Sequence, residues 1–346
     1  PFFIYYHFLV TFVALIDNNM GNSIFIVALF AIMTSCGANT SQGEKAIPAK
    51  SLIATPAFDK DSAYTYVKTQ TEFGPRVPGS EAHSQCADYL LNELNRHGAK
   101  AMIQEGKMTA YNGEPVAVRN IIGSYNPENK KRILLCAHWD SRPWADEDPN
   151  PANHKNPVLG ADDGASGVGV LLEVARQLSL NQPTVGVDII FFDTEDMGTP
   201  TFETRYNNEH SWCLGSQYWS RNKHERGYRA MYGILLDMVG GFNPTFLREG
   251  ISEHFAPGVV NKVWDIARQL GYANLFPDVK GPMITDDHLY VNQIGKIPCI
   301  NIINLNQTGD SSFVPYWHTV NDTMENISPQ TLEAVGKVVL AVLYNE

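Results

Sequence analysis

Acidic and histidine residues at the ends of apolar runs are the feature that most constrains this chain. Asp237, in "LLDMVGG" (235–241), stands where a buried strand would carry another Val or Leu. A carboxylate in such a setting is costly unless a partner, hydrogen bonds or a metal offsets its charge. The same pattern recurs in "LLCAHWDS" (134–141), "VLGADDGASG" (158–167) and "DIIFFDTEDMG" (188–198). Four such stretches predict one shared site.

The order of the apolar runs predicts the fold class. Strand-like and helix-like runs alternate, which is typical of an α/β domain with a mainly parallel, twisted central sheet and helices on both faces. Several strands are apolar on both sides, as central parallel strands are. Strands are expected at 119–125, 132–138, 185–193, 231–239 and 297–303, and helices at 165–178, 215–222, 256–271 and 328–345. Since open α/β sheets bind ligands beyond the carboxyl ends of their strands, we expect a single domain with its site there.

Composition narrows the partners. The chain has 346 residues, 44% of them hydrophobic, which is enough for the core of one large domain. Its net charge of −11, without a basic block, argues against nucleic acid and anionic membrane surfaces as partners. The cysteines show no Cys-x-x-Cys spacing, so they predict buried free thiols rather than a cysteine zinc site or a disulfide framework. They lie at positions 36, 86, 136, 213 and 299.

The amino-terminal segment predicts export. Its apolar run "SIFIVALFAIM" (23–33) is shorter than the ~20 residues of a membrane-spanning helix and suits the core of a signal peptide. The stretch "MTSCG" (33–37) resembles a bacterial lipoprotein cleavage site, with Cys36 as the lipidated residue. Secretion without a lipid is the alternative. If translation begins at Met20, residues 1–19 lie outside the protein.

These features divide the chain into three parts. Residues 1–36 are expected to be a leader, and residues 37–57 are small, polar and unpatterned like a tether. Residues 58–346 are expected to be the catalytic domain. The expected location is extracytoplasmic, either periplasmic or anchored to a membrane as a lipoprotein.

Two of the acid-bearing stretches allow a structural or a functional interpretation. His138 and Asp140 alternate, so at an extended strand end their side chains point the same way. Such a pair can be structural and hydrogen-bonded, or it can bind a metal. Asp163 lies before a glycine-rich helix start, where the helix dipole favours its charge and where an N-cap role is the alternative.

The other two stretches leave similar alternatives. Glu195 and Asp196 follow an apolar run and belong either to a site or to a solvated loop. His318 follows a proline and two aromatic residues, and is either a ligand or a loop histidine packed on Trp317. Histidine and carboxylates together, without cysteine, suit a zinc ion that keeps an open position for catalysis. We therefore expect a zinc site at the carboxyl ends of the strands.

The motifs resemble a known family. In order along the chain, the pattern of zinc aminopeptidases with two co-catalytic ions is matched by "GPRVPGS" (74–80), "AHWDS" (137–141), "GADDGASG" (160–167), "DTED" (193–196), "LLDMVG" (235–240) and "WHTVNDT" (317–323). Similarity to the glutaminyl-peptide cyclotransferase branch is carried by "ITDDH" (284–288), "FVPYWHT" (313–319) and "DMVGGFNPTF" (237–246). Animal members usually carry Glu where this chain has Asp196, so the chain resembles the bacterial type.

The resemblance implies a role for each matched position. It implies zinc ligands at Asp163, Asp196 and His318, a proton-shuttling Glu195, an acidic pair at Asp237 and Asp286, and walls around a glutaminyl side chain at Ile284, Phe313, Trp317 and Trp212. In the two-metal peptidases, the residues equivalent to His138 and Asp237 hold a second ion. With a single zinc, His138 would be a vestige of that second site, and Asp237 would share a proton with Asp286.

The expected activity follows from these roles. A single-zinc glutaminyl-peptide cyclotransferase would convert the N-terminal glutamine of peptides or proteins to pyroglutamate and release ammonia. The enzyme is expected to be a monomer apart from its lipid anchor. A two-zinc aminopeptidase on the same scaffold is the main alternative, and metal stoichiometry separates the two. A binding module without catalysis, or a structural surface lipoprotein whose acids are merely solvated, is the remaining alternative.

Overall fold

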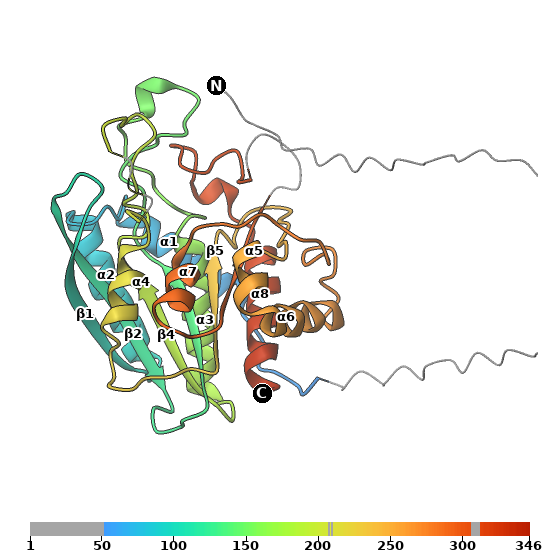
Figure 1. The fold of residues 1–346 in the computed structure, drawn as a ribbon. Coiled ribbons are helices and arrows are strands. Elements are labelled where there is room, and N and C mark those ends of the chain that lie inside the picture. Colours follow the sequence, from blue (N-terminus) through green and yellow to red (C-terminus); the bar gives the residue numbers. More distant parts are fainter. Residues whose placement is uncertain (1–51, 207, 209, 306–311) are drawn as a thin grey trace, which may run out of the picture. The chain divides into compact units, whose positions relative to one another are not determined.

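The centre of the fold is a mixed β-sheet (Figure 1). The computed structural model describes residues 52–206, 208, 210–305 and 312–346. Within these residues, six strands pair in the order β1-β2-β4-β3-β5-β6. The strands are β1 (Lys100–Thr109), β2 (Pro115–Tyr125), β3 (Arg132–His138), β4 (Gly186–Phe192), β5 (Tyr232–Asp237) and β6 (Cys299–Ile303).

The register of the sheet brings the ends of its parallel strands together. The neighbours β4, β3, β5 and β6 are all parallel. His138 pairs with Phe192, the last residue of β4, and Asp237 pairs with Ile303, the last residue of β6. The acid-bearing strand ends therefore lie in a row along one edge of the sheet.

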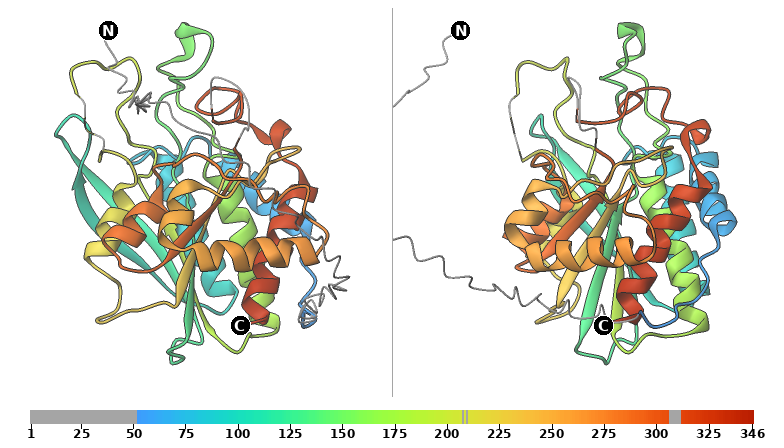
Figure 2. Two further views of the ribbon diagram at one scale, coloured as in Figure 1. Left: turned by 45° about the vertical axis from the view of Figure 1, so that its right-hand side comes forward. Right: turned by 90° about the vertical axis from the view of Figure 1, so that its right-hand side faces the viewer.

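Helices cover both faces of the sheet, as expected (Figure 2). Residues of α1, α2, α3, α6 and α8 share one hydrophobic cluster, and residues of α4 and α7 share another with the opposite side of the strands. The helices are α1 (Lys60–Glu72), α2 (Glu81–Arg96), α3 (Ala165–Leu180), α4 (Leu214–Arg221), α5 (Gly250–Phe255), α6 (Pro257–Gln269), α7 (Asp287–Gln293) and α8 (Pro329–Tyr344).

Strand β3 shows why the sequence produces two apolar layers. Ile133, Leu135 and Ala137 belong to the first cluster, whereas Leu134 and Cys136 belong to the second. Successive side chains of a strand point to opposite faces, so a strand with helices on both sides is apolar throughout. The apolar runs in the sequence therefore correctly predicted helices on both faces of the sheet.

The predicted fold class is confirmed, with one correction to the sheet. The expected strands and helices are all present, but β1 was not anticipated, and β2 pairs antiparallel with both β1 and β4. Strand β1 is long, partly exposed and rich in charged residues, so it lacks the apolar signal of the central strands. The antiparallel pairing leaves the four strands that bear the site parallel.

The described residues also bear on the sequence expectations outside the sheet. Ser51–Glu346 forms one compact unit. Among the described residues, no helix has both the length and the apolar character needed to cross a membrane. Cys86, Cys136, Cys213 and Cys299 are free and buried, as expected. The leader, the lipidation site at Cys36 and most of the tether lie outside the described residues.

A buried ion pair secures the end of the sheet opposite the site. Arg132 Nε and Nη2 each donate to Asp188, at 2.6 Å, and Asp188 also accepts the hydroxyl groups of Ser124 and Tyr228 at 2.6 and 2.8 Å. Both side chains of the ion pair are buried. This network joins β2, β3, β4 and the segment before β5.

We predict that Asp188→Asn destabilises the fold by about 3–5 kcal/mol, because it leaves a buried guanidinium without its charge partner. The exposed pair Arg268–Asp265 provides a matched control, and Asp265→Asn should change stability by less than about 1 kcal/mol. Urea unfolding followed by circular dichroism measures both. Equal effects of the two variants would contradict the importance of the buried pair.

Candidate active site

The site is assembled at the carboxyl ends of the parallel strands. His138 is the last residue of β3 and Asp237 the last of β5, while Glu195 and Asp196 lie in the turn after β4. Asp163 lies just before α3. His318 comes from the loop after β6, in a left-handed backbone conformation with φ 52°. Segments far apart in the sequence therefore converge on one place.

Two further carboxylates accept hydrogen bonds from the backbone of the site acids and so fix their positions. Asp140 accepts the backbone N–H groups of Glu195 and Asp196 at 3.0 and 3.2 Å. Asp322 does the same for Asp163, at 3.1 Å, and for the residue before it, at 2.8 Å. Each acid thus fixes two consecutive backbone units without using the side chains of the residues it holds, so these side chains stay available to a ligand.

Asp163 lies between two histidines. Its Oδ1 is 2.9 Å from His138 Nε2, and its Oδ2 is 3.4 Å from His318 Nε2. On the first side, His138 Nε2 also contacts Asp237 Oδ1 at 3.3 Å. On the second side, His318 Nε2 contacts Asp196 Oδ1 at 3.0 Å. The arrangement offers two adjacent half-sites that share the Asp163 carboxylate.

The donor atoms fit a metal ion. Donor atoms of His138, Asp163 and Asp196 all lie within 4.8 Å of one another. The Oδ2 atoms of Asp163 and Asp196 are buried and accept no hydrogen bond within the described residues, which is typical of ligand atoms that await a cation. Burial opposes protonation of His318, but the surrounding charges, led by Asp196, raise its pKa. A field that attracts a proton so strongly also favours a metal cation.

Asp163 does not act as a helix cap. The N-cap of α3 is Gly164, and no side chain caps this helix end. Gly164 has φ 96°, and a Cβ there would lie 2.6 Å from the carbonyl oxygen of Asp140 and 3.1 Å from His138 Cε1. Only glycine fits this close approach. The N-cap interpretation of Asp163 is therefore wrong, and its carboxylate faces the histidines instead.

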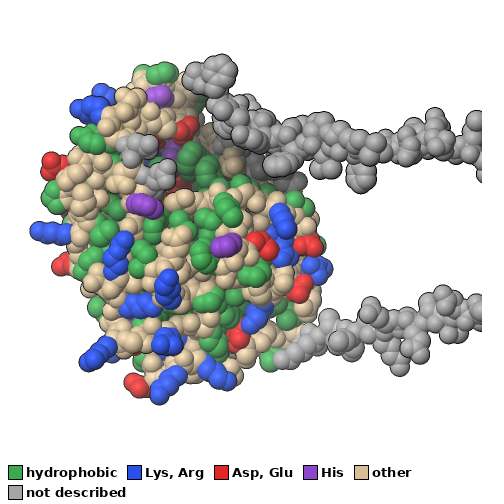
Figure 3. Space-filling view, in the orientation of Figure 1, with side chains coloured by type: hydrophobic (Ala, Val, Ile, Leu, Met, Phe, Trp, Pro, Cys, Tyr) green, Lys and Arg blue, Asp and Glu red, His purple; other side chains and the backbone are tan. Residues whose placement is uncertain are grey.

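A cavity of about 250 Å³ opens beside the acids. Every residue to which the sequence assigned a catalytic, ligand or wall role lines it except His138, which is almost completely buried beneath it. Met238, Met283, Thr285 and Ile303 complete the wall and were not anticipated, since nothing distinguishes them from core or loop residues in the sequence. In Figure 3, acidic and histidine side chains lie in a hollow among hydrophobic ones.

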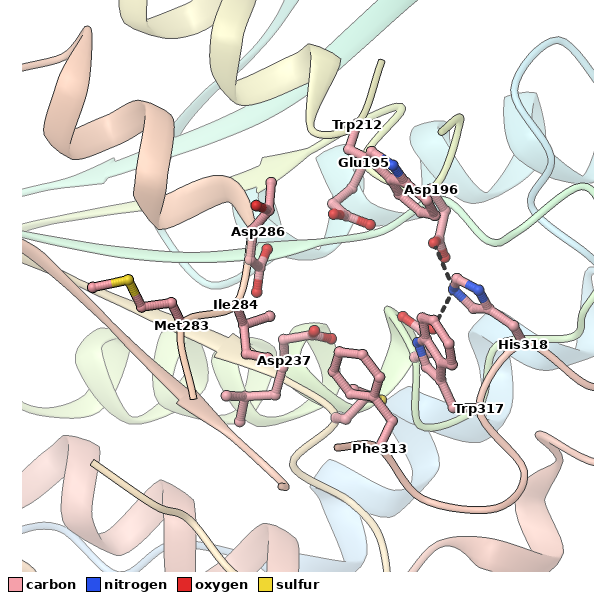
Figure 4. Close-up of a pocket in the computed structure, with 14 residues that line it drawn as sticks. Glu195, Asp196, Trp212, Asp237, Met283, Ile284, Asp286, Phe313, Trp317 and His318 are labelled. Carbon is pink, nitrogen blue, oxygen red and sulfur yellow. Dashed lines mark hydrogen bonds and ion pairs between the residues drawn. The ribbon is translucent and has the colours of Figure 1, made fainter. Parts of the chain in front are cut away.

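Asp237 and Asp286 face the cavity from different elements, and each is held by other residues. Asp237 contacts His138, whereas Asp286 accepts a hydrogen bond from Asn301 Nδ2 at 2.6 Å and another from the backbone N–H of Asp287. Burial raises the pKa of Asp237 to about 8; the hydrogen bond with His138 opposes this rise and the charge of Asp286 adds to it. The two carboxylates interact through their charges across the cavity (Figure 4).

Comparison with known proteins decides the family. The family model "Peptidase family M28" matches residues 120–343. The chain belongs to this family.

Solved structures refine the assignment within family M28. Bacteroides thetaiotaomicron glutaminyl cyclase is 54% identical with a TM-score of 0.83, and the match covers 85% of this chain and 100% of that one. A Zn-dependent exopeptidase from Parabacteroides distasonis is 55% identical, with a TM-score of 0.83 and coverage of 85% and 100%. A leucine aminopeptidase precursor from Bacteroides thetaiotaomicron is 54% identical, with a TM-score of 0.82 and the same coverage. The chain is thus similar to solved structures named for both activities that the sequence predicted.

Within this M28 site, Glu195 has a partner that the sequence did not reveal. Cys213 Sγ donates to Glu195 Oε1 at 3.1 Å, and the backbone N–H of Cys213 donates to the Glu195 carbonyl oxygen at 2.9 Å. Burial raises the pKa of the Cys213 thiol well above its ordinary value, so the thiol keeps its proton. Burial and the adjacent Asp196 raise the pKa of Glu195 well above its ordinary value. The sequence gave no signal, because a lone cysteine before a helix is usually a core residue.

Arg142 and Asp146 were missed for a similar reason. Arg142 is buried, forms a two-point ion pair with Asp146 at 2.8 and 2.7 Å, and donates to the carbonyl oxygen of Asp196 at 2.8 Å. Asp146 Oδ1 lies 3.8 Å from His318 Nδ1. A carboxylate behind a ligand histidine orients its ring. Both residues lie in an irregular stretch, where charged residues are usually solvated.

We predict that His318→Ala weakens metal binding by more than about 100-fold, because it removes a ring held between Asp163 and Asp196. The exposed His254, at the end of α5, is the control, and His254→Ala should retain the wild-type metal content. Elemental analysis after dialysis measures both. Wild-type metal content in the His318 variant would remove this residue from the ligand set.

Proposed function

We propose that this M28 protein is a glutaminyl-peptide cyclotransferase that converts an N-terminal glutamine to pyroglutamate and releases ammonia. The observation that carries the proposal is the form of the cavity, which has metal-type donors on one side and Asp286 on another, with apolar walls between them (Figure 4). Such a cavity suits a short side chain that ends in a carboxamide. Bacterial glutaminyl cyclases at 54–55% identity support the proposal.

The walls prepare the substrate for ring closure. Phe313 and Trp317 stack with ring centroids 4.3 Å apart, and Ile284 packs in the same cluster. The backbone N–H of Ile284 is fixed by Glu249 Oε1 at 2.8 Å. These side chains confine the glutaminyl side chain so that its γ-carbonyl carbon approaches its own α-nitrogen. Holding reacting groups in this way contributes up to ~7–11 kcal/mol in favourable cases.

The reaction is an intramolecular aminolysis. The α-nitrogen forms a bond to the γ-carbonyl carbon, the bond from that carbon to the amide nitrogen breaks, and ammonia leaves. Glu195 takes a proton from the α-ammonium group and gives it to the departing nitrogen, and the attacking nitrogen loses its second proton to solvent as the lactam forms. Burial and the adjacent Asp196 raise its pKa, which makes it a stronger proton acceptor than an ordinary carboxylate. Asp286, held by Asn301, and Asp237 steady the leaving nitrogen.

One zinc ion per chain, held by Asp163, Asp196 and His318, is part of the proposal. Bound there, it would polarise the γ-carbonyl group as a Lewis acid. His138 would then remain as the vestige of a second metal site. Zinc is supported by the mixed histidine and carboxylate donors and by similarity to a Zn-dependent exopeptidase.

A two-zinc aminopeptidase is the second candidate, and a specific observation favours it. His138, Asp237 and Asp163 Oδ1 form a half-site with donor distances close to those around His318. A second ion held there would occupy the side of the cavity where the cyclase needs a free α-amine. Similarity to the leucine aminopeptidase precursor, at 54% identity, also supports this candidate.

The remaining proposals concern the whole protein. We propose a leader over residues 1–36, a tether over 37–57 and a catalytic domain over 58–346, with lipid attachment at Cys36 and an extracytoplasmic location. The substrates are peptides or proteins with an N-terminal glutamine. Apart from its lipid anchor, we propose that the enzyme is a monomer.

We predict that the protein releases ammonia from glutaminyl dipeptides and that Glu195→Gln lowers the rate by about 10²- to 10⁴-fold, because the carboxamide cannot carry the proton. The variant should keep its zinc and its fold, since Glu195 is not a ligand. Ammonia release, zinc content and thermal melting measure these outcomes. Hydrolysis of a leucine anilide, assayed alongside, identifies an aminopeptidase if it exceeds cyclisation.

Asp237→Asn separates one metal from two. In the cyclase, the wild type and the variant should each bind one zinc, while cyclisation falls by about 10²-fold or more because an amide cannot exchange a proton with the leaving nitrogen as the carboxyl group can. Asp286→Asn is the matched control, since it removes the other cavity carboxylate without touching either histidine. Two zinc ions in the wild type, with one lost only in Asp237→Asn, would favour the aminopeptidase.

A further inference from the structure

A column of stacked planar groups runs from the pocket wall to the protein surface. It begins with Phe313 on Trp317, and Trp317 stacks on His318 with ring centroids 3.7 Å apart. On its other side, His318 is parallel to Trp212, 5.9 Å away. The guanidinium of Arg142 then lies 4.5 Å from the Trp212 ring. The ligand histidine is thus fixed between two tryptophans, and the column continues past it.

The far end of the column is an aromatic surface. The Arg142 guanidinium also lies 5.4 Å from the ring of Trp144. Trp144 makes edge contacts with Tyr111 at 5.5 Å and with Phe202 at 6.5 Å, and Tyr111 contacts Tyr206 at 5.9 Å. We call this set, Tyr111, Trp144, Phe202 and Tyr206, the aromatic platform.

Three loops contribute to the aromatic platform. Tyr111 lies in the turn between β1 and β2, Trp144 in the loop after β3, and the other two in the loop after β4. These loops stand beside one another above the carboxyl edge of the sheet (Figures 1 and 2). Phe202 and Tyr206 are 42% and 37% exposed, so the contacts among the four rings leave apolar area open to solvent.

The size of the cavity indicates that part of a bound peptide lies outside it, over the exposed rings of the aromatic platform. At about 250 Å³, it is smaller than the ~300 Å³ of typical pockets for drug-sized molecules and suits the first residue of a peptide rather than a longer segment. The rest of the peptide must leave along the walls of the mouth. Trp212 belongs both to the cavity and to the column, so the platform continues from a cavity wall.

The distances indicate which peptide residues can reach the platform. Trp144 is separated from Trp212 by one guanidinium, with contacts of 5.4 and 4.5 Å on its two sides. An extended chain advances about 3.3–3.6 Å per residue, so these two contacts place Trp144 no farther from Trp212 than roughly three residues of a peptide. Side chains at the second to fourth positions of a bound peptide therefore lie within reach.

We propose that the aromatic platform is a substrate subsite that binds peptide residues two to four and favours an aromatic side chain there. This inference rests on the proposed cyclotransferase function. Aromatic rings on the substrate would stack or make edge contacts with the exposed faces of Phe202 and Tyr206. The subsite directs the enzyme towards peptides with an aromatic residue shortly after the N-terminal glutamine.

Four tetrapeptide amides test the subsite: Gln-Ala-Ala-Ala and the three versions with one alanine replaced by Phe. In the wild type, at least one Phe peptide should exceed the alanine peptide about three- to tenfold in kcat/KM, mainly through KM, as expected for one or two aromatic contacts. Phe202→Ala and Tyr206→Ala, singly and combined, should reduce this ratio towards one. The control is Phe255→Ala, which removes a similarly exposed aromatic ring at the end of α5 and should leave the ratio unchanged.

The ratio separates the subsite from other roles of these residues. A wild-type ratio of one for all three Phe peptides, or a preference that survives the combined variant, would overturn the subsite. Equal losses for all four peptides would assign the aromatic residues to loop packing and would also overturn it. Ammonia release from Gln-Ala-Ala-Ala by the wild type tests the cyclotransferase separately, so its failure is distinct from the failure of the subsite.

Discussion

Everything at this site depends on how the protein keeps many carboxylates close together out of water. Like charges at such separations repel, and burial penalises each of them. The structure offsets this cost with backbone N–H donors at the strand ends. Asp140 and Asp322 each accept two consecutive N–H groups, and Glu249 accepts those of Ile251, Ser252 and Ile284. The loops are thereby fastened by acids that do not line the cavity, while Asp163 and Asp196, which do line it, each keep an oxygen atom without a hydrogen bond.

The second constraint is the orientation of His318. A histidine on a loop after β6 is free to turn unless neighbours fix its ring. Here Trp317 and Trp212 cover its two faces, and Asp146 lies behind its Nδ1 atom. Gly198 lets Trp212 take this place, because a Cβ at 198 would lie 1.9 Å from the indole. The same indole forms a wall of the cavity, so the position of the histidine and the shape of the substrate site are determined together.

The sequence predicted the parallel core because its signal is local: β3, β4, β5 and β6 are largely apolar on both sides, and the first three end at, or directly before, an acid or a histidine. It missed β1, whose exposed positions carry Lys, Met, Glu and Thr, and it missed the antiparallel pairing of β2, which depends on the adjacent hairpin. The gathering of Asp196 and Asp237 was predictable from strand ends, whereas Asp163 precedes a helix and His318 lies in a loop, so their places in the site were implied by the family resemblance. The supporting roles of Arg142, Cys213 and Asp322 were not, because each depends on a partner distant in sequence.

Asp163 is the residue on which the choice between the two activities turns. Its two oxygens each belong to one of two half-sites with similar geometry. The donor atoms alone are therefore compatible with a one-zinc cyclase and with a two-zinc peptidase. What differs is the remainder of the cavity. A peptidase must admit a water molecule and hold the α-amine at the second half-site, whereas a cyclase must close a side chain upon its own amine. Asp286 on Asn301 and the stacked Phe313 and Trp317 restrict the space around a side chain rather than around a peptide bond. The walls, more than the donors, therefore argue for ring closure.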